Sequence, residues 1–254
     1  MPETGNKYTT QFDMESVNNN SHTLSIRFAS DGLSLLVLDE NQNTIATNAI
    51  EAKTEELDVE TLKLELNSLF ESKIEFAHTH YILDNPYYTV VPESATDESL
   101  RPALLAIQHH ELIDKNLYYC TNQTQFQHVS VLFACPEAIV NAIDAHKNEL
   151  KHRMTVFIDF VFNQNKSGIH LALREKEIDI VVFKQQLLLA NSFCYESPAD
   201  VIFHVANAAS KLQLEIQETN KYVYSNAHYP ELAALLTSKF SNIHFINQNS
   251  ILCV

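Results

Sequence analysis

The chain has 254 residues, of which 45% are hydrophobic and 19% charged, so it is long and apolar enough to bury a sizeable core. Its 17 lysines and arginines against 32 aspartates and glutamates give a formal net charge of −15. This charge repels a phosphate backbone and an anionic membrane surface, which argues against nucleic-acid partners and against membrane binding. A polar or basic protein partner remains compatible with it.

The beginning of the sequence and the cysteines indicate the compartment. Residues 1–22 lack the basic segment followed by an apolar stretch that marks a signal peptide, and no run reaches the roughly 18 apolar residues that span a bilayer. The cysteines form no Cys-x-x-Cys pair, which favours free thiols over a metal cluster or a disulfide framework. They are Cys120, Cys135, Cys194 and Cys253. We therefore expect a cytoplasmic protein.

Apolar patterning predicts the elements that follow this polar lead-in. Asp31-Gly32 indicates a two-residue hairpin, because glycine adopts positive φ at little cost. The expected strands are 24–29, 33–38, 44–50, 74–83, 87–91, 117–120 and 129–134. The expected helices are 59–70, 98–109 and a long helix opened by Pro136 that carries Ile139, Val140, Ile143 and Leu150.

The segment 156–162 fits a strand or a helix by periodicity, and we interpret it as a helix because Asn163-Gln164-Asn165 is typical of a last turn and exit. Three strands follow at 169–173, 177–183 and 186–193. Ser197-Pro198-Ala199-Asp200 is a capping box with proline at the first helical position. After this helix we expect a strand at 222–224, a helix begun at Pro230 and a strand at 243–246.

The order strand–strand–strand–helix–strand–helix–strand thus occurs twice, offset by roughly 145 residues, which indicates an internal duplication. It is the order of elements, and not the identity of residues, that repeats. We expect a polar lead-in over 1–22, a first half over 23–152 and a second half over 153–254.

Three segments carry a resemblance to a known family. They are LSIRFASDGLSLLVLD at 24–39, ILDNPYYTVVPES at 82–94 and EIDIVVFKQQLLLANSFCYESPADVIFHV at 177–205. With them the chain resembles DUF3822, an uncharacterised family of Bacteroidetes, over nearly its whole length. The resemblance implies an α/β fold of duplicated ribonuclease-H-like units, which is the actin-like ATPase fold of actin and sugar kinases.

Active members of that fold bind phosphate between two hairpins, each typically reading Asp-x-Gly, where the Asp organises Mg²⁺ and glycine lets backbone N–H groups approach. Here Arg27 stands where the first Asp is expected. The second hairpin turn is Arg174-Glu175-Lys176-Glu177, which has no glycine and turns two carboxylates toward the expected phosphate. If 156–162 were instead the first strand of this half, Asp159 would take the Asp position, followed by bulky residues. The late loop, which would pack an adenosine, is Ser225-Asn226-Ala227 and also lacks glycine.

Two histidines are the candidate metal ligands. His78 and His80 occupy positions i and i+2 of an expected strand and so share a face. Asp84, or His109-His110-Glu111, would add ligands if the fold brought them near. Two ligands without a spaced third arise often by accident, so we expect surface or packed histidines and no metal cofactor.

The segment Asp84-Asn85-Pro86-Tyr87-Tyr88 is unusual. Its first three residues favour a turn, and an extended run places the two tyrosine rings on opposite faces. One reading buries one tyrosine and exposes the other. The alternative is a partner-binding edge formed by Asp84, Tyr87 and Tyr88, since exposed tyrosines act as interface anchors.

We therefore expect an actin-like protein without intact nucleotide-binding motifs, which binds an unknown protein partner and has no catalytic or cofactor-binding residues. The alternative is an enzyme or a small-ligand- or metal-binding protein that uses the cleft between the halves, including a nucleotide held in a divergent way.

Overall fold

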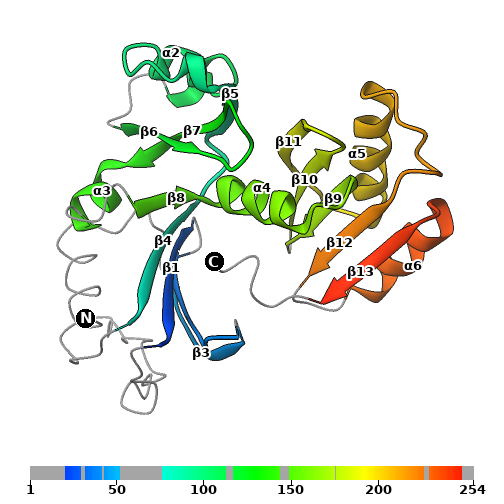
Figure 1. Cartoon of the computed structure of the whole chain (residues 1–254), viewed down its shortest axis with the longest axis horizontal. Coiled ribbons are helices and arrows are strands. Elements are labelled where there is room, and N and C mark those ends of the chain that lie inside the picture. The colour runs from blue at the N-terminus through cyan, green and yellow to red at the C-terminus, as the bar shows by residue number, and fades with distance from the viewer. Residues whose placement is uncertain are drawn as a thin grey trace, which may run out of the picture.

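The computed structural model describes residues 21–29, 32–41, 43–51, 76–112, 117–143, 149–174, 176–225 and 229–247. Two five-stranded sheets form the two ends of the molecule, and a three-stranded sheet lies beside the first (Figure 1). The expected lead-in, the expected helix over 59–70 and the loop residues Asn226 and Ala227 lie outside the described residues.

The first sheet has the order β3-β2-β1-β4-β8. Its strands are β1 (Thr23–Ala29), β2 (Gly32–Leu38), β3 (Thr44–Glu51), β4 (His78–Asp84) and β8 (Leu150–His152). The first three strands are antiparallel neighbours, whereas β4 pairs in parallel with β1 and with β8. Most residues of β1 and β2 are buried, so both faces of this part of the sheet are covered.

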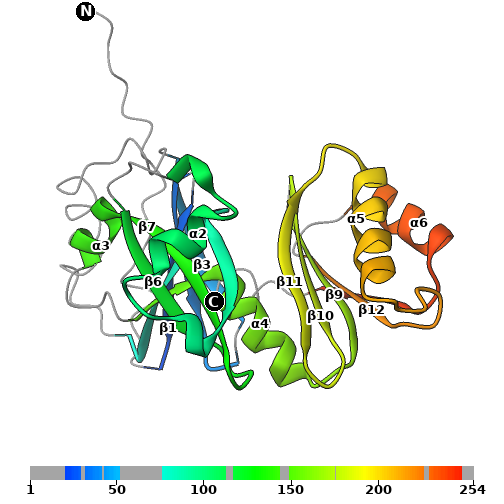
Figure 2. The same cartoon turned by 90° about the horizontal axis from the view of Figure 1, so that it is seen from above.

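The second sheet repeats this order as β11-β10-β9-β12-β13. Its strands are β9 (Gly168–Leu173), β10 (Glu177–Phe183), β11 (Leu187–Cys194), β12 (Lys221–Ser225) and β13 (Ile243–Asn247). Helices α5 (Pro198–Lys211) and α6 (Pro230–Lys239) cover one face (Figure 2). The capping box is confirmed, because Asp200 Oδ2 accepts hydrogen bonds from the Ser197 backbone and hydroxyl at 2.9 Å. The duplication predicted from element order is confirmed.

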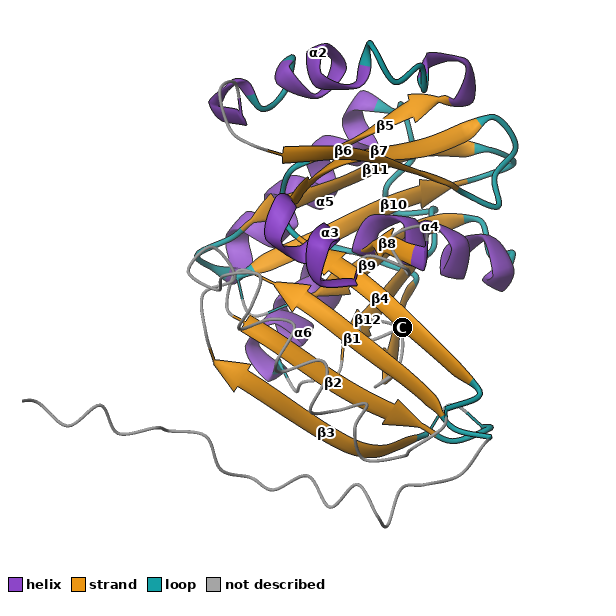
Figure 3. Cartoon of the chain, turned by 90° about the vertical axis from the view of Figure 1, so that its left-hand side faces the viewer, coloured by secondary structure: helices purple, strands orange, loops and turns teal. Residues whose placement is uncertain are grey.

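The third sheet is an insertion between β4 and β8 and has the order β5-β7-β6. It contains β5 (Tyr88–Pro92), β6 (Leu117–Gln123) and β7 (Val129–Pro136), and the central β7 pairs antiparallel with each of the other two. One face carries α2 (Arg101–Ala106) and the 3-10 turns η2 (Glu93–Ala95) and η3 (His110–Leu112), as Figure 3 shows. The sequence pattern gave these strands but not their separation into a sheet of their own.

The helix α4 (Arg153–Gln164) connects the two larger sheets (Figure 2). The interpretation of 156–162 as helix is confirmed, and Asn165 ends the helix in the left-handed conformation with φ 48°. The expected long helix after Pro136 was partly wrong. Helix α3 spans Glu137–Ile143, and Leu150 lies in β8, where its apolar side chain fills the same core from a strand.

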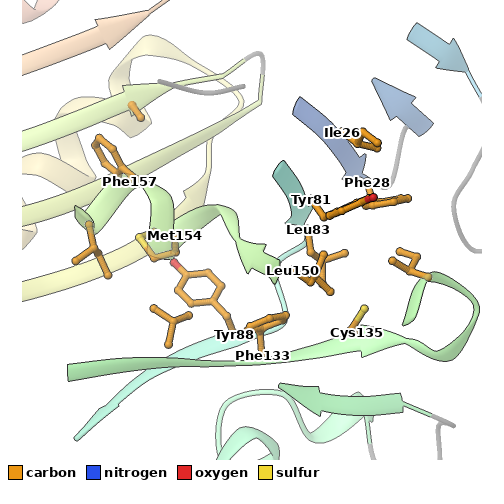
Figure 4. Packing of buried hydrophobic residues seen from close by; sticks show 14 of the residues in the cluster. Ile26, Phe28, Tyr81, Leu83, Tyr88, Phe133, Cys135, Leu150, Met154 and Phe157 are labelled. Atoms are coloured by element: carbon orange, nitrogen blue, oxygen red, sulfur yellow. The ribbon is translucent and has the colours of Figure 1, made fainter. Parts of the chain in front are cut away.

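One continuous hydrophobic cluster joins these parts. It contains Phe28 and Leu83 from the first sheet, Phe133 from the third and Phe157 from α4 (Figure 4). Tyr224 of the second sheet belongs to the same cluster. A separate cluster lies between the second sheet and its helices α5 and α6. Because α4 contributes apolar side chains to the shared cluster, the two larger sheets are held by common packing.

Candidate functional site

The turn after β4 positions the first functional carboxylate. Asn85 acts as a local clamp: its side chain accepts a hydrogen bond from Tyr87 N at 3.0 Å and donates one to Ala134 O at 2.9 Å. This Asx-type turn, which the sequence predicted, fixes the chain between β4 and β5. Asp84 is therefore held at the carboxyl end of β4 with its side chain only 6% exposed.

Two arginines from different halves meet at Asp84. Arg27 of β1 donates from Nε and Nη2 to Asp84 Oδ2, at 2.8 and 2.6 Å. Arg174, directly after β9, donates from Nη1 to Asp84 Oδ1 at 3.0 Å and from Nη2 to Asp179 Oδ1 at 2.9 Å. It also pairs with Glu177. The side chains of Arg27 and Arg174 are 24% and 19% exposed, so these ion pairs are largely shielded from water.

A third arginine completes this group. Arg153, the first residue of α4, places Nη1 2.8 Å from Asp179 Oδ2, and its side chain is only 4% exposed. We call the six residues Arg27, Asp84, Arg153, Arg174, Glu177 and Asp179 the ionic cluster. It draws on β1, β4, α4, β10 and the β9–β10 turn, and so it spans both larger sheets.

A hydroxyl chain also crosses between the sheets at the ionic cluster. Ser192 Oγ donates to Asp179 Oδ1 at 2.6 Å, and the Tyr88 hydroxyl lies 2.8 Å from Ser192 Oγ. Because the single Ser192 proton goes to the carboxylate, Tyr88 is the donor to Ser192. Burial raises the pKa of Tyr88, and the negative charge of Asp179 raises it further, so this tyrosine remains protonated.

The protonation states follow from burial and from neighbouring charge. Burial alone would raise the pKa of Asp84, but Arg153, Arg174 and Arg27 together lower it below its usual range. Burial likewise opposes charge on Arg174, yet Asp179, Asp84 and Glu177 raise the pKa of Arg174 above its ordinary value. Asp84 and Arg174 are therefore both charged in the folded protein. The cluster as a whole brings together three arginines and three acidic residues.

His152 supports the cluster from the end of β8. Its Nδ1 accepts from Met154 N at 3.1 Å, so Nε2 carries the proton and donates to Asn85 O at 3.0 Å. Burial lowers the pKa of His152 to about 4. The neutral His152 ring therefore caps the N-terminus of α4 and also holds the turn at Asn85 by a hydrogen bond.

Three of the residues that the resemblance singled out lie in this cluster. Arg27 and Arg174 are there, and Glu177 pairs with Arg174 instead of facing an open site. Glu175 lies outside the described residues. Asp159 lies on α4, where it accepts a hydrogen bond from Gln125 N at 2.7 Å. It therefore does not take the position at the end of a strand that the alternative reading of 156–162 gave it.

The candidate metal ligands are not brought together with further ligands. The His78 and His80 rings stack with centroids 6.4 Å apart on β4. Asp84 lies at the other end of that strand, and His109 Nε2 bonds to Tyr88 O. Across the described ranges, no group of three His, Cys, Asp or Glu side chains is placed to hold a metal ion.

The candidate interaction residues lie mostly inside the molecule. Asp84 and Tyr88 are 7% and 6% exposed and bind residues of the second half. Tyr87 is partly exposed and packs edge-on against the His109 ring, with 5.7 Å between centroids. The structure therefore uses Asp84 and Tyr88 as contacts within the chain.

Sequence reasoning missed Arg153, Asp179, Ser192 and His152. Asp179 offered a signal, because an acidic residue inside the apolar run 177–183 must be paired when buried. The sequence around His152 and Arg153 contains no comparable signal, because their roles depend on the change from strand to helix between these two residues. Each partner is distant in sequence.

No helix in the part of the chain that the structure describes has the length and apolar character to cross a membrane. With the fold and cluster described, the architecture is the actin-like ATPase fold. It is shared with a Bacteroides thetaiotaomicron protein of "actin-like ATPase fold and unknown function", at TM-score 0.70 and 19% identity over 96% of this chain and 98% of that one. The ethanolamine utilization protein EutJ of Carboxydothermus hydrogenoformans is a more distant match, with TM-score 0.47 and 10% identity over 94% and 90% of the two chains.

The chain belongs to the family described as "Protein of unknown function (DUF3822)", whose pattern matches residues 10–243. No curated protein is similar enough in sequence to be matched.

Proposed function

We propose that this protein is a non-catalytic member of the actin-like fold that works as a protein-interaction module. The ionic cluster carries the proposal. In active members the two hairpins hold phosphate and the hairpin Asp organises Mg²⁺; here arginines reach from both hairpin regions to the chain's own carboxylates. Internal ion pairs thus take the place of nucleotide contacts.

The charges of the cluster support this. A phosphate needs uncompensated donors, and a magnesium ion needs carboxylate oxygens that are free to coordinate it. Here both oxygens of Asp84 accept hydrogen bonds from arginines, and Asp179 lies between Arg174, Arg153 and Ser192. Binding Mg-ATP would require breaking buried ion pairs, and each broken pair leaves a buried charge without a partner.

The proposal takes the protein to be cytoplasmic. Cys120, Cys135 and Cys194 are free thiols, as is usual in a reducing compartment. Burial raises the pKa of Cys120 and of Cys135, which keeps these two thiols protonated and unreactive.

Calorimetric titration of the full chain with Mg-ATP and Mg-GTP, combined with a phosphate-release assay, tests the proposal. We expect no saturable heat up to millimolar nucleotide and no release above the rate without protein. Micromolar affinity together with turnover would overturn it.

One observation favours a second candidate, a protein that binds an anionic small molecule in a divergent way. None of the three guanidinium nitrogens of Arg153 makes a well-directed hydrogen bond within the described residues, although the side chain is buried. Binding of a nucleotide without turnover, lost in Arg153→Gln, would favour this candidate over the interaction module.

A further inference from the structure

Two edge strands from different sheets face one another across a groove. Strand β5 is the edge of the inserted sheet and β11 is the edge of the second sheet (Figure 1). The groove has a volume of about 400 Å³ and is lined by residues 88–92 and 187–191, together with Gln108, His128 and Val129. Such a volume falls within the range of ~300–1,000 Å³ of ligand pockets.

Within the described residues, the outward peptide groups of β5 are satisfied at Tyr88 and open at Val90. Ala134 N donates to Tyr87 O and Glu93 N donates to His128 O, both at 2.9 Å. The backbone N–H and C=O groups of the odd-numbered residues of β5 therefore point to β7, and those of the even-numbered residues point to the groove. Tyr88 is satisfied, since its N–H donates to Pro86 O and its carbonyl accepts from His109 Nε2, both at 3.1 Å. Pro92 has no N–H. Val90 is left with open peptide groups.

The edge of β11 is covered only in part. Tyr195 N donates to Lys176 O at 2.9 Å. In the regular part of β11 the backbone N–H and C=O groups of the odd-numbered residues therefore point to β10. The outward Ser192 N–H donates to Asn191 Oδ1 at 2.9 Å, and the Cys194 carbonyl accepts from His204 Nε2 at 3.3 Å. Among the described residues, the Ser192 carbonyl and the Cys194 N–H have no partner, and neither peptide group of Ala190 has one. A bulge opposite Val182 and Phe183 ends the regular pairing beyond Ala190.

Sheet edges are usually covered to prevent unwanted pairing, so two open edge positions that face one groove offer a place for an added strand. Within the described residues, neither Val90 nor Ala190 has a partner for its outward N–H and C=O groups. Successive residues of an inserted strand present their peptide groups to opposite sides. Neighbouring residues of one extended peptide can therefore pair with Ala190 on one side and with Val90 on the other.

We propose that this groove binds an extended peptide of a partner protein by strand addition, with uncharged residues inside it and lysines or arginines on its flanks. The lining contains no Asp, Glu, Lys or Arg, so a charged side chain within the groove would find no counter-charge. The net charge of −15 attracts basic flanks. The proposal rests on the proposed function, because it names the partner chemistry of an interaction module.

A phage-displayed library of random decapeptides, panned against the full chain, tests the proposal. Ala190→Pro removes the N–H from the open edge, and Cys194→Pro removes one from the same edge beyond the groove. We expect selected peptides to bind Ala190→Pro at least tenfold more weakly than the wild type and Cys194→Pro within twofold. Val90→Pro, which alters the opposite wall, should also weaken binding at least tenfold.

N-methylation of the selected peptide gives a second readout. Methyl groups on the amides of the two central residues should weaken binding at least tenfold, and those on flanking amides should not. A library without binders, or binders indifferent to Ala190→Pro while that variant keeps the wild-type melting temperature, would overturn the proposal. Self-association of the chain lost in Ala190→Pro would also overturn it, because a second copy would then be the occupant. Nucleotide turnover would refute the proposed function without changing these peptide results.

Discussion

Asp84 Oδ1 lies 3.0 Å from Arg174 Nη1, and this ion pair joins the end of β4 in the first sheet to the residue after β9 in the second. The Asp84 side chain is 6% exposed and that of Arg174 is 19% exposed. The contact is therefore largely shielded from water, and it is made within one chain between the two larger sheets.

Asp84→Asn should destabilise the fold strongly. Arg27 and Arg174 both donate to the Asp84 carboxylate and would lose it as a charged partner. Removal of one member of a buried ion pair costs about 3–5 kcal/mol. Urea unfolding at pH 7 measures the loss. Glu93→Gln is the control, since Glu93 pairs with the exposed His128 and its loss should cost less than about 1 kcal/mol. Equal effects of the two substitutions would contradict the role given to Asp84.

The free energy of unfolding should decrease as the pH falls from about 6.5 to about 4. Burial lowers the pKa of His152 and of His170 to about 4, whereas the unfolded chain titrates near 6.5. Below 6.5 the unfolded state thus binds more protons, and each histidine contributes a slope of up to about 1.4 kcal/mol per pH unit. Asp84 stays ionised through this window, because its pKa is lowered.

Urea unfolding at half-unit pH intervals measures that slope. His152→Gln should reduce it by close to one proton, with His170 supplying the remainder. A wild-type stability that does not change between pH 6.5 and 4 would contradict the neutral, buried state of both rings.

Gly168→Ala should destabilise the second sheet. Gly168 has φ of +152°, and an added Cβ would lie 2.4 Å from Asn220 O, whose carbonyl accepts from Ile169 N. Backbone atoms cannot move away cheaply, so we expect a loss of at least about 2 kcal/mol. The melting temperature of Ser167→Ala is the control, since that hydroxyl makes a single bond of 3.4 Å. A Gly168→Ala variant as stable as wild type would show that Asn220 shifts freely.

Phe157→Ala should weaken the whole molecule in a single transition. Phe157 is buried in the cluster that α4 shares with both larger sheets, and its ring lies 6.1 Å from that of Tyr224. Truncating such a side chain costs about 3–5 kcal/mol. The chain contains no tryptophan, so tyrosine fluorescence and circular dichroism are the probes, and they should change together. Two separated transitions would show that the halves unfold independently.

Much of the fold was predictable because its cause is local. The hairpin signal at Gly32, the capping box at Ser197 and the exit at Asn165 each depend on residues a few positions apart, and they set the order of elements. The duplication followed from that order. The inserted sheet was not predictable, because which strands pair depends on contacts over long sequence distances.

The site was predictable only in part. The resemblance led us to expect Arg27 and Arg174 in the hairpins that bind phosphate in active members of the fold, but the sequence could not show what these arginines contact. Asp84 and Arg174 are 90 residues apart, and their meeting depends on the packing of two sheets. A buried charge indicates that a partner exists, and only the fold identifies it.

The junction between β8 and α4 has a mechanical consequence. Strand β8 ends at His152 and the helix begins at Arg153, with no intervening loop. Hinges in proteins that close around ligands are loop or terminal residues that absorb large changes in φ and ψ. Here the two residues at that position are His152, whose ring caps α4 and bonds to Asn85 O, and the buried Arg153. Rotation of one half against the other would disturb the contacts of both residues. The connection between the halves therefore resists bending, which favours a constant width of the groove between β5 and β11.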